Sequence, residues 1–242
     1  MTANGRGGRF LTTRWTLVNA AGHRSDAHSA AALAELCQIY WPPLYSYLRR
    51  RGHDAEEAQD LTQGFFARLL ERQDLRNVDP ARGRFRGFLL TALKRYAINE
   101  HERATAGRRG GQHIRLSLDF DEAERSYALD RRNDETPERV FDRKWAAIAI
   151  ERALQRLRNE SHEAGKTAAT DMLLPYLSDT GELPAYRAVA ADLGLTEGAV
   201  KVAVHRLRQR FGAILRLEIS ETVLTPSEID DEMRELIRAV SS

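Results

Sequence analysis

Residues 185–211 read AYRAVAADLGLTEGAVKVAVHRLRQRF and hold the densest pattern in the chain. Ala190 is small, Gly194 follows four residues later, and Val200 lies six residues beyond that glycine. A small residue lets two helices approach closely, a glycine accepts a left-handed turn, and Thr196 has the right side chain to cap the next helix. The segment therefore predicts two short helices joined by a tight turn, which is the helix-turn-helix arrangement.

The second helix of this segment carries two rows of side chains with different chemistry. Its apolar row should pack on the domain and consists of Val200, Val204, Leu207 and Phe211. Its basic row should face outward, where a helix in a major groove meets bases and phosphates, and consists of Lys201, His205 and Arg208. A helical hairpin with solvated arginines is the alternative, and the tight turn together with the one-sided basic row favours a DNA-reading helix.

Composition restricts the class of protein. The 242 residues suffice for one or two domains, and 42% hydrophobic with 30% charged residues is a soluble globular composition. No apolar run approaches the length of a membrane span, and the N-terminal MTANGRGGRF lacks the apolar core of a secretory signal, so we expect a cytoplasmic protein. The single cysteine, Cys37, excludes a disulfide within the chain, and its apolar surroundings predict that it is buried.

The net charge of +2 names no partner, but its distribution is informative. Basic islands at 82–109 and 197–210 alternate with acidic segments at 119–143 and 218–238. Such islands are typical of proteins that bind polyanions. Ordinary solvated helix faces explain the charges equally well when charge is considered alone.

The periodicity is helical almost throughout, which predicts an all-α fold. A first helical block covers 29–51, with Pro42-Pro43 expected to break or restart it and Gly52 to end it. Asp54 should cap a second helix that runs to about Arg72. A third helix should start near Phe85 and continue past Asn99.

These segments divide the chain into two small helical domains. We expect an N-terminal extension at 1–28, a first domain at 29–112, an acidic linker at 113–137, a helix-turn-helix domain at 138–217 and an acidic C-terminal extension at 218–242.

Two segments of the first domain carry a family resemblance. They are DAEEAQDLTQGFFARLLER at 54–72 and GRFRGFLLTALKRYAINEHERATAGRR at 83–109. Together they resemble region 2 of the sigma-70 family in its extracytoplasmic-function type, and 185–211 resembles region 4 of the same family. The resemblance covers about 29–110 and 138–217. It implies a sigma factor that binds core RNA polymerase and directs promoter recognition, DNA melting and transcription initiation.

The resemblance also implies partners and residues on the protein side. The β′ clamp and the β flap of the polymerase are the expected contacts, and an anti-sigma factor is a further partner class. The clamp contact would fall on Asp60, Gln63 and Phe66. Phe66 stays open between this role and core packing, while Phe65 is expected in the core.

For promoter DNA, the resemblance implies a −10 element bound by the loop at 74–84 and the helix after it, which would trap an unpaired base. The residues matched to this role are Arg84, Arg86, Lys94, Arg95, Asn99, Arg103, Arg108 and Arg109. Core packing is favoured over base stacking for Phe85, Phe88 and Tyr96. The residues matched to a −35 element are Thr196, Glu197, Lys201, His205, Arg206 and Arg208, with Lys201 and Arg208 foremost.

The chain departs from the family pattern in an insertion at about 159–183 and in its acidic tail. One hypothesis is that the tail packs on a basic surface and weakens DNA binding by the isolated protein. The favoured alternative is a short closing helix. The apolar residues that it would pack are Ile229, Met233, Leu236 and Ile237.

Three other functions compete with a sigma factor. A stand-alone helix-turn-helix regulator explains 185–211 but leaves 54–109 without a role. A DNA-processing enzyme needs a catalytic constellation, and the sequence offers no metal-spaced carboxylates, phosphate loop or nucleophile motif. A protein-interaction scaffold leaves both basic islands unexplained. We therefore expect no enzymatic activity, no cofactor and no metal.

Overall fold

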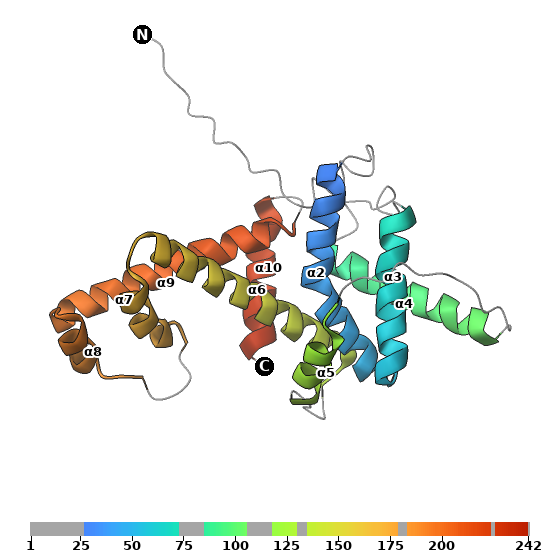
Figure 1. Ribbon diagram of the computed structural model, residues 1–242, viewed down its shortest axis with the longest axis horizontal. Helices are drawn as coiled ribbons and strands as arrows, with labels where there is room; N and C mark the ends of the chain where they lie inside the picture. Colours follow the sequence, from blue (N-terminus) through green and yellow to red (C-terminus); the bar gives the residue numbers. More distant parts are fainter. Residues whose placement is uncertain are drawn as a thin grey trace, which may run out of the picture. The chain divides into compact units, whose positions relative to one another are not determined.

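The computed structural model describes the backbone of residues 27–72, 85–105, 118–129, 135–178, 183–223 and 226–241. All the elements in these ranges are helices, which confirms the predicted all-α class (Figure 1). In chain order they are α2 (Ala27–Arg50), α3 (Ala55–Arg72), α4 (Phe85–Thr105), α5 (Phe120–Leu129), α6 (Pro137–Glu163), α7 (Thr167–Leu173), the 3-10 helix η3 (Leu174–Leu177), α8 (Tyr186–Leu193), α9 (Glu197–Ser220) and α10 (Pro226–Ser241).

The helices form two compact units. Unit 1 comprises Met1–Trp145 together with Ser220–Ser242, and unit 2 comprises Ala146–Ile219. The chain therefore passes from unit 1 into unit 2 along α6 and returns to unit 1 at the end of α9. The sequence placed the start of the second domain at 138 and treated 218–242 as a separate extension, whereas the structure groups both the first turns of α6 and the C-terminal helix with unit 1.

Helix α2 lies at the centre of unit 1 and contacts α3, α4 and α5 (Figure 1). The expected break at Pro42-Pro43 is wrong, because both prolines lie inside one continuous helix. A proline removes a helical hydrogen bond, and burial of its neighbours Trp41, Leu44 and Tyr45 offsets that loss. Cys37 is buried as predicted, and burial raises the pKa of its thiol to about 12, so it stays protonated at neutral pH.

The ends of α2 and α3 follow their local sequence. Gly52 has φ +101°, and His53 N–H donates to the Leu48 carbonyl at 3.3 Å to close α2. Asp54 Oδ1 accepts from Glu57 N–H at 2.8 Å and so caps α3. The predicted boundary between these helices is confirmed at both residues.

A helix occupies part of the segment predicted as a linker. Phe120 of α5 packs edge-on against Trp41 and Tyr45, with ring centroids 5.0 and 5.4 Å apart. Arg49 donates to both carboxylate oxygens of Glu124, at 2.7 and 2.8 Å. The sequence was read as a linker because its charges are mixed, but the buried aromatic contact joins α5 to unit 1.

The C-terminal helix α10 is fixed to unit 1 by a buried cluster around Arg86. The side chains of Arg86 and Glu232 are 9% and 3% exposed, and Arg86 Nε lies 3.0 Å from Glu232 Oε2. Arg86 also pairs with Asp142, and its guanidinium carbon lies 4.6 Å from the centre of the Trp145 ring. Burial disfavours the guanidinium charge, but the two carboxylates outweigh burial and raise the pKa of Arg86.

This arrangement supports the closing-helix interpretation of the tail. Leu236 is buried, and Ile229 and Met233 are partly buried as expected. Ile237 is an exception, because it faces outward and is 56% exposed. The autoinhibitory hypothesis for the tail stays a prediction.

Unit 2 has its own core between α7, η3, α8 and α9. Its buried residues are Leu173, Tyr176, Val189, Ala190, Val200 and Val204. Tyr176 stacks on Tyr186 with ring centroids 4.8 Å apart, and its hydroxyl donates to the Pro184 carbonyl at 2.6 Å. The expected insertion at 159–183 thus includes α7 and η3, which contribute core side chains to unit 2.

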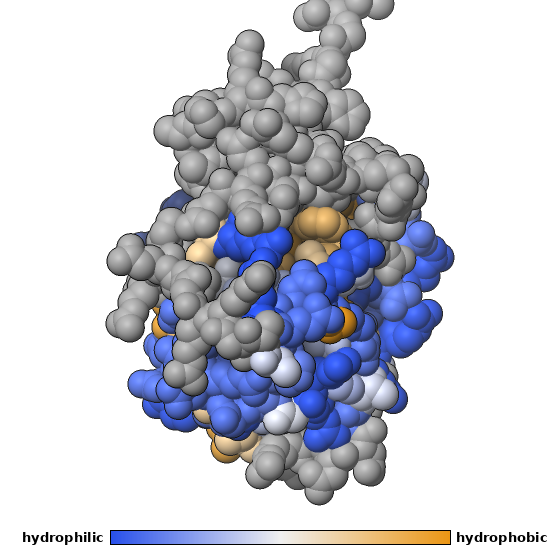
Figure 2. Space-filling model, turned by 90° about the vertical axis from the view of Figure 1, so that its right-hand side faces the viewer, coloured by the Kyte–Doolittle hydropathy of each residue, from blue (hydrophilic) through white to orange (hydrophobic). Residues whose placement is uncertain are grey.

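No helix in the part of the chain that the structure describes is long and apolar enough to cross a membrane. On the face seen in Figure 2, the coloured residues are mostly hydrophilic, and hydrophobic ones appear only in small separate areas.

The cluster around Arg86 predicts a large loss of stability when Glu232 is truncated. Glu232→Ala leaves a buried guanidinium short of one partner, and we expect unit 1 to lose about 3–5 kcal/mol of unfolding free energy. Urea unfolding followed by tryptophan fluorescence measures this loss, since Trp41 and Trp145 both lie in unit 1.

The matched control on the same helix is Arg234→Ala, which removes the exposed pair with Asp231 and should cost only about 0.3–0.5 kcal/mol. The double variant Arg86→Met with Glu232→Leu should lose less than the sum of its single substitutions, because both buried charges disappear together. Equal losses for Glu232→Ala and Arg234→Ala would contradict the assigned role of the cluster.

Candidate nucleic-acid interface

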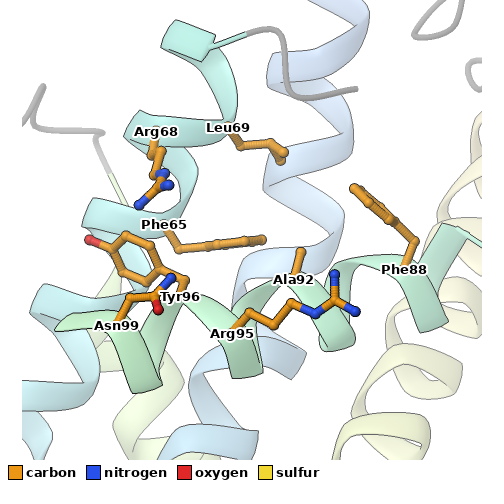
Figure 3. Close-up of a pocket in the computed structure, with 8 residues that line it drawn as sticks. All are labelled: Phe65, Arg68, Leu69, Phe88, Ala92, Arg95, Tyr96 and Asn99. Carbon is orange, nitrogen blue, oxygen red and sulfur yellow. The ribbon is translucent and has the colours of Figure 1, made fainter. Parts of the chain in front are cut away.

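A pocket of about 360 Å³ opens between α3 and α4 in unit 1. Its lining residues are Phe65, Arg68, Leu69, Phe88, Ala92, Arg95, Tyr96 and Asn99. Figure 3 shows Arg68, Tyr96 and Asn99 gathered at one end of this pocket and Phe88 at the other, with Arg95 extending between them. The pocket thus combines aromatic faces with guanidinium and amide donors, which are the groups that stack on and hydrogen-bond to nucleobases.

Packing holds the aromatic part of this pocket in place. The rings of Phe65 and Tyr96 meet edge to face with centroids 5.9 Å apart, and the Arg68 guanidinium lies 5.9 Å from the Tyr96 ring centre. Burial and the nearby Glu100 carboxylate raise the pKa of Tyr96 to about 12, so its phenol stays neutral at physiological pH. The preference for Phe85 and Tyr96 as core residues fits their burial, while Phe88 is partly exposed at the pocket.

The residues expected to contact polymerase divide into two groups. Asp60 is exposed and Gln63 is partly exposed on the outer side of α3. Phe66 is 1% exposed and packs against Phe65, with ring centroids 5.3 Å apart. Phe66 is therefore a core residue and not a surface contact.

The residues expected to bind DNA from α4 also divide. Arg95 and Asn99 are exposed at the pocket. Lys94 is half-buried, donates to Glu138 at 2.7 Å and lies over the Tyr47 ring, so its ammonium group already has partners within unit 1. Arg103 is exposed and pairs with Glu100 at 2.6 Å near the end of the helix.

Arg86 is a clear correction. It was matched to a DNA contact, but it is buried between Glu232, Asp142 and Trp145 and has a structural role. Three other matched residues, Arg84, Arg108 and Arg109, lie outside the described residues, as does the whole loop at 74–84.

In unit 2, the predicted turn between α8 and α9 has the expected local geometry. Gly194 adopts φ +64° and ψ +30°, and Leu195 N–H donates to the Ala190 carbonyl at 2.9 Å. Thr196 Oγ1 accepts from Ala199 N–H at 3.2 Å and caps α9. The sequence therefore located this turn and its cap at the right residues.

The outward side of α9 differs from the predicted basic row. Val200 and Val204 are fully buried, as expected, and define the inward direction. Since successive residues turn by roughly 100°, Val202 lies about 160° from both valines, whereas Arg208 lies only about 40° from Val204. The residues on the outward side, all of them exposed, are Gly198, Val202, His205, Arg206 and Gln209.

Contacts on α9 agree with this geometry. Lys201 pairs with Glu197 at 2.7 Å and lies over the Tyr186 ring, and the Glu197 carboxylate raises the pKa of Lys201. Arg208 donates to the Tyr176 carbonyl at 2.9 Å. His205 and Arg206 make no hydrogen bond or ion pair with the part of the chain that the structure describes. The side chains most available to a ligand are thus those of His205 and Arg206, ahead of Lys201 and Arg208.

Sequence reasoning missed four residues at these surfaces. Arg68 was matched to no role, yet it lines the α3–α4 pocket. Val202 and Gln209 were not among the residues matched to the −35 element, because the outward side was identified from the basic row. Arg187, exposed at the start of α8, lies near enough to Glu197 to lower its pKa. Helical spacing from Val200 and Val204 was the signal that could have found Val202 and Gln209.

No group of three or more histidine, cysteine, aspartate or glutamate side chains able to hold a metal is present within the described ranges.

Comparison with known families shows that residues 36–107 match the family model of sigma-70 region 2. This segment contains α3, α4 and the pocket between them, and the match supports membership of the sigma-70 family. Comparison with curated proteins and with solved structures found no match.

The positive φ of Gly194 predicts that Gly194→Ala destabilises unit 2. An added methyl group meets no atom within 4 Å, so the expected cost of about 1–2 kcal/mol comes from the left-handed backbone alone. Gly212→Ala is the matched control, because Gly212 also has free space around it but lies inside α9, where alanine favours the helix. Hydrogen exchange of amides in α8 and α9 measures both effects, and equal protection in the two variants would refute the prediction.

Proposed function

From the premise that residues 36–107 form a sigma-70 region 2 domain, we propose that this protein is a sigma factor of the extracytoplasmic-function type. In this proposal unit 1 binds core RNA polymerase and the −10 element, and unit 2 binds the −35 element through α9. The observation that carries the proposal is the α3–α4 pocket, which lies inside the matched segment and offers Arg68, Arg95 and Asn99 beside aromatic rings.

Promoter melting explains the chemistry of this pocket. Opening a duplex requires that one strand be held single, and a base removed from the stack needs a ring to pack on and polar groups for its edge. Phe88 and Tyr96 supply apolar ring surface, while Asn99 and Arg95 supply donors that suit base edges or phosphates. The volume of about 360 Å³ is ample for one nucleobase.

Polymerase binding is assigned to the outer side of α3. Asp60 and Gln63 give this helix a polar face, while its apolar face packs in unit 1 through Phe65 and Phe66. An amphipathic helix with this division can offer its polar face to a partner without loss of its own core. The β′ clamp is the proposed partner of this face, and an anti-sigma factor would compete for it.

The −35 contact is assigned to the outward side of α9. A helix preceded by a tight turn and capped at its start can enter a major groove with its N-terminal residues against base edges. In this proposal Arg206 and His205, both exposed, contact phosphates or bases there, and the exposed Arg187 at the start of α8 contacts a flanking phosphate.

A stand-alone DNA-binding regulator is the second candidate, because α8 and α9 alone suffice for it. The two functions differ in one measurement, which is co-purification of the full chain with core RNA polymerase. A sigma factor forms a stoichiometric complex and enables initiation from promoter DNA, whereas a regulator binds DNA without associating with the polymerase.

Substitutions in the pocket are predicted to impair promoter opening. We expect Arg95→Ala and Asn99→Ala each to lower the amount of open complex about tenfold, because a contact to an unpaired base is worth on the order of 1–3 kcal/mol. Permanganate footprinting of unpaired thymines with the reconstituted holoenzyme measures open complex. Arg125→Ala, at an exposed arginine of α5, is the control and should leave opening unchanged.

Core polymerase affinity should stay unchanged in both pocket variants, since Asp60 and Gln63 are untouched. If both variants opened promoters as well as the wild type, the role given to the pocket would be wrong even though the polymerase complex formed.

Arg206→Ala is predicted to weaken duplex binding more than Arg208→Ala. The Arg206 guanidinium makes no hydrogen bond or ion pair with the described residues, so all its donors can reach DNA. The Arg208 guanidinium already donates to the Tyr176 carbonyl. We expect about a tenfold loss for Arg206→Ala and a decrease of about one in the slope of log affinity against log salt, as for a lost phosphate contact. Arg158→Ala, at an exposed arginine of α6 in unit 2, is the control. A larger loss of affinity for Arg208→Ala would indicate instead that the row of Lys201, His205 and Arg208 faces the DNA.

A further inference from the structure

Val202 is an exposed valine at the centre of the outward side of α9. It is 49% exposed, whereas Val200 and Val204 on either side of it are buried. An exposed valine in a helix stabilises neither by burial nor by propensity, because β-branched residues are poorer helix formers than alanine or the long straight side chains. The fold of unit 2 therefore does not account for an apolar residue at this position.

The residues next to Val202 leave its side chain accessible to a binding partner. Helical side chains lean toward the N-terminus, so Val202 extends over the turn that contains Gly198. Gly198 has no side chain, and a methyl group added to it would meet nothing within 4 Å. The two methyl groups of Val202 are thus unshielded on the side from which a duplex would approach.

The surrounding charges indicate which kind of partner this is. His205 and Arg206 follow Val202 on the same side, and Arg187 lies near the start of α9. An exposed valine with an arginine on the same side of the helix suits a groove lined by phosphates that contains a small apolar group. In the major groove of DNA that group is the 5-methyl of thymine.

We propose that Val202 is a specificity-determining residue that reads the 5-methyl group of a thymine in the major groove of the upstream promoter element. The proposal rests on the assignment of α9 as a DNA-reading helix. The stiff β-branched side chain holds its methyl groups in one orientation, so contact with the thymine methyl costs little side-chain entropy. Cytosine lacks this methyl group and presents a polar amino group beside it instead.

The test uses duplexes that the full-length protein, bound to core polymerase, selects from a random-sequence pool. Each thymine of the selected upstream element is replaced in turn by deoxyuridine, which removes only the 5-methyl group. At one position we expect the wild type to lose affinity about threefold to tenfold, the effect of one buried methyl group. Val202→Ala should lose a similar factor on the unmodified duplex and be insensitive to deoxyuridine at that position.

Val240→Ala is the matched control, because Val240 is a helical valine with a similar exposure of 46%, located in α10. This variant should keep the full deoxyuridine effect of the wild type. Val202→Thr retains the branched shape but replaces one methyl by a hydroxyl, and we expect an intermediate loss. Circular dichroism should report undiminished helix content in Val202→Ala, since alanine is the better helix former.

Two outcomes overturn the proposal: a wild type that is indifferent to deoxyuridine at every position, or a Val202→Ala variant that retains the wild-type effect. If selected duplexes still depend on Arg206 in either case, α9 remains a DNA-reading helix and only the role of Val202 fails. If no upstream sequence is selected at all, the proposed function of unit 2 fails together with the inference.

Discussion

The charge of Arg86 places the strongest constraint on unit 1. A buried guanidinium is stable only when carboxylates compensate it, and its partners come from α6 and from α10, with Glu232 lying 146 residues further along the chain. The pairing therefore requires that the C-terminal helix return to unit 1 after unit 2 has been completed. It also gives the acidic tail a structural reason, since the buried Glu232 is part of the core rather than of a solvated charged surface.

The helix caps and the tight turn could be predicted from the sequence, because each depends only on residues close to it in the chain. The cap at Asp54, the turn at Gly194 and the cap at Thr196 each depend on side chains within a few positions. The roles of Arg86 and Phe66 were wrong because they depend on residues far away in the sequence. Arg86 lies in a basic island, and this position predicts a DNA contact. Only the structure shows that Glu232 of α10 pairs with it. Likewise, two adjacent phenylalanines on one helix leave undecided whether the second faces inward, and the packing of α3 against its neighbours places both in the core.

The two units offer nucleic acid different kinds of surface, and the difference follows from how each is built. In unit 1, two helices separate enough to leave a pocket lined by rings and donors, which suits one base at a time. In unit 2, α9 presents a convex row of exposed side chains on a helix whose other side fills the core, which suits the groove of an intact duplex. A pocket for one base is of little use until the duplex opens, whereas a groove-reading helix needs the duplex closed. On the proposed function, each surface therefore fits a different state of the DNA.

The rotation of α9 about its own axis decides which of its side chains can reach that duplex. The row Lys201, His205 and Arg208 follows helical spacing, but spacing alone does not say how far a row lies from the buried side. Lys201 and Arg208 lie within roughly 40–60° of the buried Val204, close enough that Tyr186 and the Tyr176 carbonyl engage them. These contacts join the first half of α9 to α8 and η3. Lys201 and Arg208 of the basic row thus help to pack α9 within unit 2, and the outward side carries Val202, His205 and Arg206.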